Sequence, residues 1–397
     1  MPLKLENLAE VGGAFLKLGL TSFGGPVAHI GYFRKEFVER RRWLDDAEFA
    51  DTVALCQMLP GPASSQVVFC LGMRRAGLGG ALLASLCFML PSAAGMILFA
   101  YGIATLGHGG GAGWLHGLKL AAVSVVALAV WAMGGSLCPD WPRRLMGLAT
   151  AAAALFFPGA LCQVGAIAAC GLVGSSAFRG TAPAPSDLRP GLGRRHVWAA
   201  ASLIAFGGLL LFLPILARMT GSRPVAVFDG FYRAGSLVFG GGHVVLPLLR
   251  SALVPRGWIG DDAFLAGYGA AQAVPGPLFT FAAYLGTVIQ GGTHAWAGGV
   301  LALFAIFLPA WLLVGGAYPF WYLFRGLGWA QGALRGANAA VVGLLLAALY
   351  RPVCTGAIRS PWDGVAAVAG IVLLGRLRAP PWLVVALMAA AGQWLLP

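Results

Sequence analysis

The feature that most constrains this 397-residue chain is an internal repeat built around two breaks in apolar sequence. The segment Phe15–Gln66 contains both breaks, at Phe23–Pro26 and at Pro60–Pro62, and much of it returns at Phe231–Phe279. A repeat of this kind constrains the architecture of the whole chain. The aligned pairs are Phe15 with Phe231, Lys17 with Arg233, Phe23-Gly24-Gly25 with Phe239-Gly240-Gly241 and, after a slip of one residue, Trp43 with Trp258, Gln57 with Gln272 and Pro60-Gly61-Pro62 with Pro275-Gly276-Pro277.

The composition indicates an integral membrane protein. The chain is 59% hydrophobic and only 10% charged, whereas soluble domains carry roughly 25% charged residues. Its net charge of +13 lies mostly in short loops. This pattern is typical of membrane topology and lipid head groups, and it argues against nucleic acid as a partner. In a membrane protein, helices broken at matching positions of two halves point to a transport site.

Motifs for enzyme chemistry are missing from the sequence. There is no H-E-x-x-H, G-x-S-x-G or P-loop pattern, and the seven cysteines form no C-x-x-C pair. We therefore expect no enzyme activity, no cofactor and no metal site, and we interpret the cysteines as small buried residues. These are Cys56, Cys70, Cys87, Cys138, Cys162, Cys170 and Cys354.

The apolar segments predict an all-α polytopic fold with about nine full spans and four shorter limbs beside the breaks. A span needs roughly 20 residues, and the segments at the breaks are shorter than this. Each pair of limbs forms either a re-entrant hairpin or a broken crossing, and the sequence leaves both open. The expected spans are 79–106, 114–137, 145–157, 160–178, 197–217, 296–323, 330–350, 361–375 and 381–396, with a glycine-rich loop at Gly107–Gly113.

The distribution of basic residues predicts the topology and the domains. If both breaks are re-entrant, the basic loops of the first half fall on the cytoplasmic side. The unmatched span at 197–217 then inverts the second half, which places Arg325, Arg376 and Arg378 inside. We expect an N-terminal repeat at 1–178, a basic linker plus one helix at 179–225, and an inverted C-terminal repeat at 226–397.

The run FGGPVAHIGYFRKEFVERRRWL, followed by ALCQMLPGPASSQ, resembles the chromate ion transporter family. The doubled length and the second FGG and PGP set resemble its long-chain, two-domain branch. This resemblance implies export of chromate across a bacterial-type cytoplasmic membrane, which confers chromate resistance. It also implies alternating access as the mechanism. A sulfate or other oxyanion transporter and an uncoupled anion channel of the same fold stay open, as does association into a homodimer.

The breaks are the expected site of the anion. A helix N-terminus carries free N–H groups and about half a positive charge, which favours oxyanions. Repeated cations in or near apolar helices, with few carboxylates nearby, favour the same kind of substrate. Snorkelling to the interface is the alternative for Lys119 and Arg335. The candidate substrate-binding residues are Lys17, Thr21, Ser22, Phe23, Gly24, Gly25, Pro26, His29, Gln57, Pro60, Gly61, Pro62, Ser64, Ser65, Gln66, Lys119, Arg233, Phe239, Gly240, Gly241, His243, Gln272, Pro275, Gly276, Pro277 and Arg335.

Overall fold

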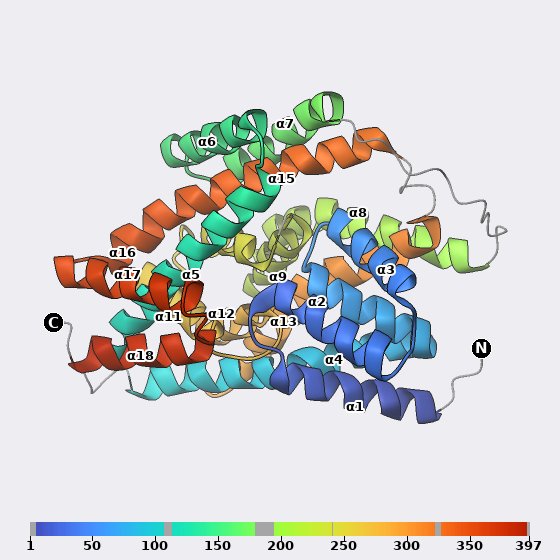
Figure 1. Ribbon diagram of the computed structural model, residues 1–397, viewed down its shortest axis with the longest axis horizontal. Coiled ribbons are helices and arrows are strands. Elements are labelled where there is room, and N and C mark those ends of the chain that lie inside the picture. Colours follow the sequence, from blue (N-terminus) through green and yellow to red (C-terminus); the bar gives the residue numbers. More distant parts are fainter. Residues whose placement is uncertain (1–4, 107–112, 179–193, 240, 322–326, 395–397) are drawn as a thin grey trace.

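The computed structural model describes residues 5–106, 113–178, 194–239, 241–321 and 327–394, and within these ranges it is helical without strands (Figure 1). An all-α fold, as predicted, is therefore confirmed. Several expectations fall partly outside the described residues: most of the glycine-rich loop, residues 179–193 of the linker, Gly240, and the ends of the spans predicted at 296–323 and 381–396.

The first half contains two short helices between two long ones. The first break ends α1 (Leu5–Thr21), and the chain resumes as α2 (Gly25–Phe33), which widens into a π-helical segment at Arg34–Arg40. The second break separates α3 (Asp46–Met58) from α4 (Ala63–Leu106). Helix α4 bends at Ala76–Gly77, where the backbone is non-helical. The bend divides α4 into the limb and the span that the sequence predicts.

Four further helices complete the described part of the first half and lead into the second. Asp140 accepts a hydrogen bond from the Arg143 amide, so it caps the N-terminus of a helix whose first turn contains a proline. The helices are α5 (Gly113–Leu137), α6 (Trp141–Phe156), α7 (Ala160–Ala177) and α8 (Arg194–Thr220).

The second half repeats this order. Short 3-10 turns at Gly242–Val244 and Leu278–Thr280 follow its two breaks. The helices are α9 (Arg223–Ser236), α10 (Val245–Leu253), α11 (Asp261–Ala271), α12 (Phe281–Gln290), α13 (Ala295–Ala317), α15 (Gly328–Ala348), α16 (Thr355–Ala357), α17 (Pro361–Gly375) and α18 (Pro381–Trp394), with a 3-10 turn at Tyr318–Phe320 and a π-helical segment at Leu349–Cys354.

The expected number of spans is only partly confirmed. Six helices among the described residues are long and apolar enough to cross a membrane, and they correspond to six of the nine predicted spans. The segments predicted at 145–157, 361–375 and 381–396 form α6, α17 and α18, which have 16, 15 and 14 residues. Helices of that length reach about 21–24 Å, less than the roughly 30 Å of a bilayer core. The sequence pattern located these three helices, but it counted as full spans segments that are too short to cross a bilayer.

The two halves interlock rather than stand side by side. Helix α15 of the second half packs on α6 and α7 of the first, and α5 packs on α17 and α18 (Figure 1). Glycines make these approaches possible: a Cβ atom on Gly117 would lie 1.9 Å from the Met388 carbonyl oxygen, and one on Gly336 would lie 1.9 Å from that of Cys170. Small residues at helix contacts are the usual means of close packing in membranes.

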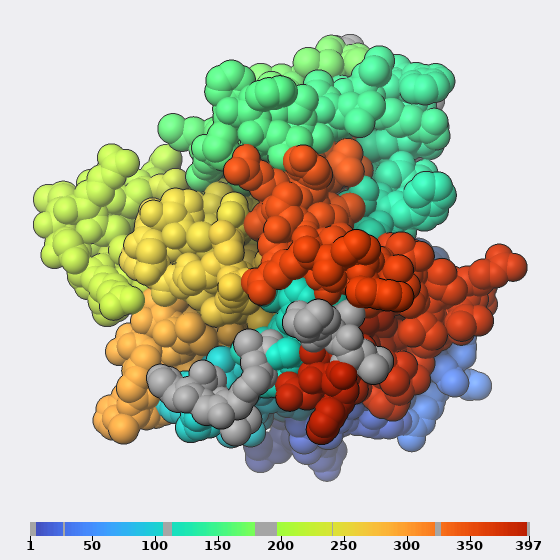
Figure 2. Space-filling model, turned by 90° about the vertical axis from the view of Figure 1, so that its left-hand side faces the viewer, coloured from blue at the N-terminus to red at the C-terminus, as the bar shows by residue number. Residues whose placement is uncertain are grey.

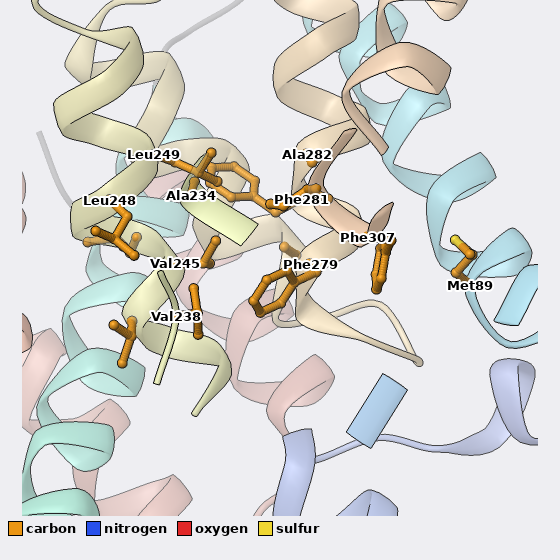
Figure 3. Packing of buried hydrophobic residues seen from close by; sticks show 14 of the residues in the cluster. Met89, Ala234, Val238, Val245, Leu248, Leu249, Phe279, Phe281, Ala282 and Phe307 are labelled. Atoms are coloured by element: carbon orange, nitrogen blue, oxygen red, sulfur yellow. The ribbon is translucent and has the colours of Figure 1, made fainter. Parts of the chain in front are cut away.

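A continuous hydrophobic core surrounds the breaks of the second half (Figure 3). Val238, just before the second FGG sequence, is fully buried, and Phe279, just after the second PGP sequence, is 1% exposed. The Phe279 ring lies 5.9 Å from that of Phe307 in α13. The loops at the breaks are thus held by packed side chains on both flanks, which fixes their backbones for the contacts described below.

Candidate functional site

Glycine is required at the breaks because the backbone there is left-handed. The φ angles are 99° at Gly24, 77° at Gly25 and 122° at Gly61 in the first half. In the second half they are 151° at Gly241 and 98° at Gly276. A side chain at such angles strains the backbone, so these positions favour glycine over any other residue.

The four breaks meet in two equivalent pairs, each joining one half to the other. The Gly61 amide donates to the Val238 carbonyl at 2.7 Å, and the Gly276 amide donates to the Ser22 carbonyl at 2.8 Å. Val238 directly precedes the second FGG sequence, as Ser22 precedes the first. Each PGP loop is therefore bonded to the FGG loop of the opposite half, through aligned residues.

A cavity of about 510 Å³ borders three of the four breaks, and the Pro60–Pro62 loop does not line it. Gly24, Gly25 and Pro26 line one side, and α5 contributes an apolar wall that includes Ala129 and Ala132. From the second half, Gly241, Gly242, His243, Gln272, Gly276 and Arg378 also line it. The structure thus brings together seven sequence-predicted residues, namely Gly24, Gly25, Pro26, Gly241, His243, Gln272 and Gly276.

The cavity offers positive partial charge and a hydrogen-bonding imidazole. Helix α2 begins at Gly25 and the helical segment leading into α10 begins at Gly242, so the N-terminal ends of both face the cavity region. The Nδ1 atom of His243 lies 2.7 Å from the Tyr268 hydroxyl, which leaves Nε2 as the ring nitrogen available to a ligand. This combination suits a small oxyanion.

Several buried polar atoms near the first-half breaks lack a hydrogen-bond partner among the described residues. Ser22 Oγ, His29 Nδ1, Ser65 Oγ and Gln66 Oε1 belong to this set. His29 Nε2 lies 3.2 Å from the Ser22 carbonyl oxygen, and Gln66 Nε2 donates to the Pro60 carbonyl at 2.7 Å. Buried polar atoms normally find a partner, so these four atoms are available to hydrogen-bond a polar ligand. Ser64 is buried nearby in the first turn of α4.

The repeated cations lie elsewhere, and most of them are paired. Lys17 lies 3.6 Å from Glu36, Lys119 lies 2.7 Å from Asp262, and Arg233 lies 2.7 Å from Asp229. The expectation that these cations lack nearby carboxylates is wrong, because Glu36 lies in the π-helical segment, Asp229 lies one turn before Arg233 in α9, and Asp262 lies in the first turn of α11. Arg335 donates to the Phe178 carbonyl at 3.2 Å. None of the four lines the 510 Å³ cavity, and their contact with substrate stays a prediction.

The other predicted residues that the structure describes do not line the cavity. Thr21 is exposed and bonds its hydroxyl to the Lys17 carbonyl at 2.8 Å, and Gln57 is exposed near the end of α3. Phe23, Phe239, Pro60 and Pro275 are half-buried, and Pro62 and Pro277 are buried. These residues shape the loops. Gly240 lies outside the described residues.

Two features of the structure were not predicted from the sequence. Arg378 contributes the guanidinium-bearing residue of the cavity lining, from the loop between α17 and α18, although the sequence suggested only a role in topology. A bidentate clamp also recurs: Arg34 Nε donates to Asp46 at 2.7 Å, and Arg250 Nε donates to Asp261 at 2.7 Å. The aligned Arg and Asp positions were the signal that could have revealed the clamp.

Metal and thiol chemistry find no support in the part of the chain that the structure describes. No group of three or more His, Cys, Asp or Glu side chains there is arranged to hold a metal ion. Cys56 Sγ and Cys70 Sγ lie 3.8 Å apart as free, buried thiols. The cavity lining itself offers backbone, imidazole, amide and guanidinium groups.

Long apolar helices, paired helix breaks and a central cavity define a multi-pass membrane transporter. The chain belongs to the chromate transporter family, whose model matches residues 9–175 and 225–393. It is 31% identical to the chromate transport protein of Pseudomonas aeruginosa over 313 residues, which are 75% of this chain and 69% of the relative. The chromate transport protein of Cupriavidus metallidurans is 28% identical over 343 residues, 84% of this chain and 80% of that protein. An uncharacterised transporter of Methanocaldococcus jannaschii is 25% identical over 350 residues, 85% of this chain and 82% of that protein. No solved structure matches the chain.

Proposed function

We propose that this protein is a secondary transporter that exports chromate across the cytoplasmic membrane and so confers chromate resistance. The substrate assignment rests on the family and on relatives named as chromate transport proteins. The observation that carries the site assignment is the reciprocal bonding of the breaks, Gly61 to Val238 and Gly276 to Ser22, beside the 510 Å³ cavity.

The mechanism that fits these contacts is alternating access by two inverted repeats, one at 1–178 and the other at 226–397. Equivalent hydrogen bonds join the halves in both directions, as a pseudo-two-fold relationship requires. An exchange of the two repeats between equivalent arrangements would then open the cavity to one side or the other. Helix N-termini, His243 Nε2, Gln272 and Arg378 are the groups assigned to the dianion.

Transport by purified protein in liposomes tests this proposal. Chromate uptake is followed with and without sulfate as competitor, and with and without an imposed pH gradient. We expect saturable chromate flux that sulfate inhibits weakly, and we expect His243→Gln to raise the KM for chromate. The exposed His294 in the loop before α13 supplies the matched control, His294→Gln.

Each alternative gives a different result in the same assay. Flux of sulfate in place of chromate supports a sulfate transporter of the same fold. Flux that never saturates and ignores the pH gradient supports an uncoupled channel. Absence of chromate flux in a folded preparation, under both gradient conditions, contradicts the substrate assignment.

A further inference from the structure

A cluster of ion pairs lies near the charged end of the first repeat. Glu36 accepts hydrogen bonds from Arg41 at 2.7 Å and Arg40 at 3.0 Å, and it lies 3.6 Å from Lys17. Glu10 accepts from Arg75 at 2.6 Å and Arg41 at 3.1 Å, and also from the Trp43 indole at 3.0 Å. Two carboxylates therefore satisfy a group of cations packed around one tryptophan.

Both carboxylates of this cluster are held ionised. Burial raises the pKa of Glu36, but hydrogen bonds from Arg41 and Arg40 and the charge of Lys17 outweigh burial and lower that pKa below its ordinary value. For Glu10, burial again opposes ionisation, and the hydrogen bonds from Arg75, Trp43 and Arg41 again lower the pKa. In the first repeat, the ionised carboxylates of Glu10 and Glu36 therefore supply negative charge among these cations.

The second repeat keeps two of the four cations and the tryptophan but has lost both carboxylates. Arg233 aligns with Lys17, Trp258 aligns with Trp43, and Arg256 aligns with Arg41. The guanidinium of Arg256 lies 4.9 Å from the Trp258 ring centre, as that of Arg41 lies 5.9 Å from Trp43. At the positions of Glu10 and Glu36, however, the second repeat has Ala226 and Ala252.

The missing side chains leave a cavity of about 390 Å³. Ala226, Ala252, Arg233, Arg256 and Trp258 all line it, and α8 adds Arg218. The one carboxylate in the lining belongs to Asp229, which already pairs with Arg233 at 2.7 Å. Among the described residues, Arg218 and Arg256 have no carboxylate partner, whereas each cation of the first-repeat cluster pairs with Glu10 or Glu36.

The helices that border this cavity carry exposed apolar side chains. Figure 2 shows α8 in yellow-green, the α9–α10 region in yellow and the α6–α7 pair in green as neighbours on one face. Leu161 and Val164 of α7, and Leu216 of α8, are exposed apolar side chains beside the cavity or its lining. Basic groups that can pair with a head group, beside exposed apolar side chains, are the requirements of a phospholipid site, and this cavity has both.

We propose that the 390 Å³ cavity binds a phosphate-type oxyanion, which takes the place that Glu10 and Glu36 occupy in the first repeat. Arg256 and Arg233 bind its oxygens, as guanidinium groups bind phosphate. The anion comes either from the head group of an anionic phospholipid or from free solution. This site is separate from the cavity between the breaks and does not depend on chromate as the substrate.

Thermal unfolding of the purified full-length protein in neutral detergent tests the site. Four probes are titrated: dioctanoyl phosphatidylglycerol, dioctanoyl phosphatidylcholine, inorganic phosphate and inorganic sulfate. We expect an anionic probe to stabilise the wild type saturably, and we expect Arg256→Gln and Ala252→Glu to weaken its apparent affinity at least about tenfold. Arg376→Gln, which removes an exposed arginine elsewhere, and His243→Gln, at the other cavity, should retain this stabilisation.

The pattern of probes identifies the source of the anion. Stabilisation by phosphatidylglycerol but not by phosphate or phosphatidylcholine indicates a lipid head group, and stabilisation by inorganic phosphate or sulfate indicates a free anion. A probe that stabilises the wild type, Ala252→Glu and Arg256→Gln with equal affinity overturns the proposal, as does the absence of saturable stabilisation by any anionic probe.

A second comparison needs no ligand. Ala252→Glu and Ala252→Gln fill the cavity with side chains of nearly equal volume, but only glutamate supplies the negative charge. Without added anion, the glutamate variant should have the higher unfolding temperature, because its carboxylate pairs with the arginines. Equal unfolding temperatures would contradict the argument that this cavity needs a negative charge.

Discussion

The Gly61 amide donates a 2.7 Å hydrogen bond to the Val238 carbonyl, so the second break of the first repeat is fastened to the first break of the other. The aligned bond, from Gly276 to Ser22, measures 2.8 Å. The two bonds therefore join aligned positions of the repeats in both directions. They also place the helix ends of both repeats around one cavity.

Alanine at Gly61 should destabilise the protein. The φ angle of 122° is unfavourable for alanine, and its Cβ atom would lie 2.7 Å from Gln66 Nε2 and 3.3 Å from the Ala310 Cβ atom. We expect a loss of about 1–3 kcal/mol in the free energy of unfolding, together with slower chromate flux. The control is Gly207→Ala, within α8, where no atom lies within 4 Å of the added Cβ atom. Equal stability of the two variants would show that the Gly61 loop is not constrained.

The packing of α5 against α18 depends on the absence of a side chain at Gly117. A Cβ atom there would lie 1.9 Å from the Met388 carbonyl oxygen, so Gly117→Leu must separate the helices. Overpacking of this kind costs about 1–3 kcal/mol or more, which should appear as a lower unfolding temperature in detergent. Gly134→Leu, also on α5 and without neighbouring atoms at its Cβ position, should fold normally. Comparable losses in both variants would contradict an interlocked pair of repeats.

The stabilising effect of Glu36 should depend on pH in a defined direction. Its pKa is lowered in the folded protein, since the hydrogen bonds from Arg41 and Arg40 outweigh the effect of burial. Its ionised pairing therefore stabilises the fold above the ordinary carboxyl pKa, and this contribution is lost as pH falls through the lowered value. The stability difference between wild type and Glu36→Gln should be largest near neutral pH and vanish in acid. A difference that grows on acidification would be inconsistent with this pairing.

Removal of the Glu36 carboxylate should allow the first repeat to bind an anion, as we propose for the 390 Å³ cavity of the second repeat. Glu36→Ala recreates the alanine found at Ala252 and leaves Arg40 and Lys17 without their carboxylate partner. We expect this variant to gain stabilisation by the anionic probe that stabilises the wild type, with an additional binding event in a titration. The Arg376→Gln variant, also altered by one charge, should gain none. An unchanged number of bound anions in Glu36→Ala would argue against the equivalence of the two positions.

The sequence predicted the features that local chemistry determines. The glycines and prolines at the four breaks were sufficient to place the ends of α1, α3, α9 and α11 within a few residues. The bonds between Gly61 and Val238 and between Gly276 and Ser22 join residues far apart in the chain, and such contacts depend on tertiary packing rather than on local preference.

The cations show the same limit. Lys119 pairs with Asp262, a residue in the first turn of α11 in the other repeat, and the sequence offered no means to bring the two together. In contrast, the exchange of Glu10 and Glu36 for Ala226 and Ala252 was visible in the alignment of the repeats. Only the structure shows that both alanines line a cavity beside Arg256.

Blocking the cavity between the breaks tests the central claim most directly. Ala132 of α5 lines this cavity and is exposed, so Ala132→Trp fills space without displacing the packed core. Ala149→Trp, at an exposed position of α6, is the matched control. We predict that Ala132→Trp abolishes chromate flux in liposomes at an unchanged unfolding temperature, while Ala149→Trp transports normally. Equal chromate flux through both variants would contradict the assignment of this cavity to the substrate.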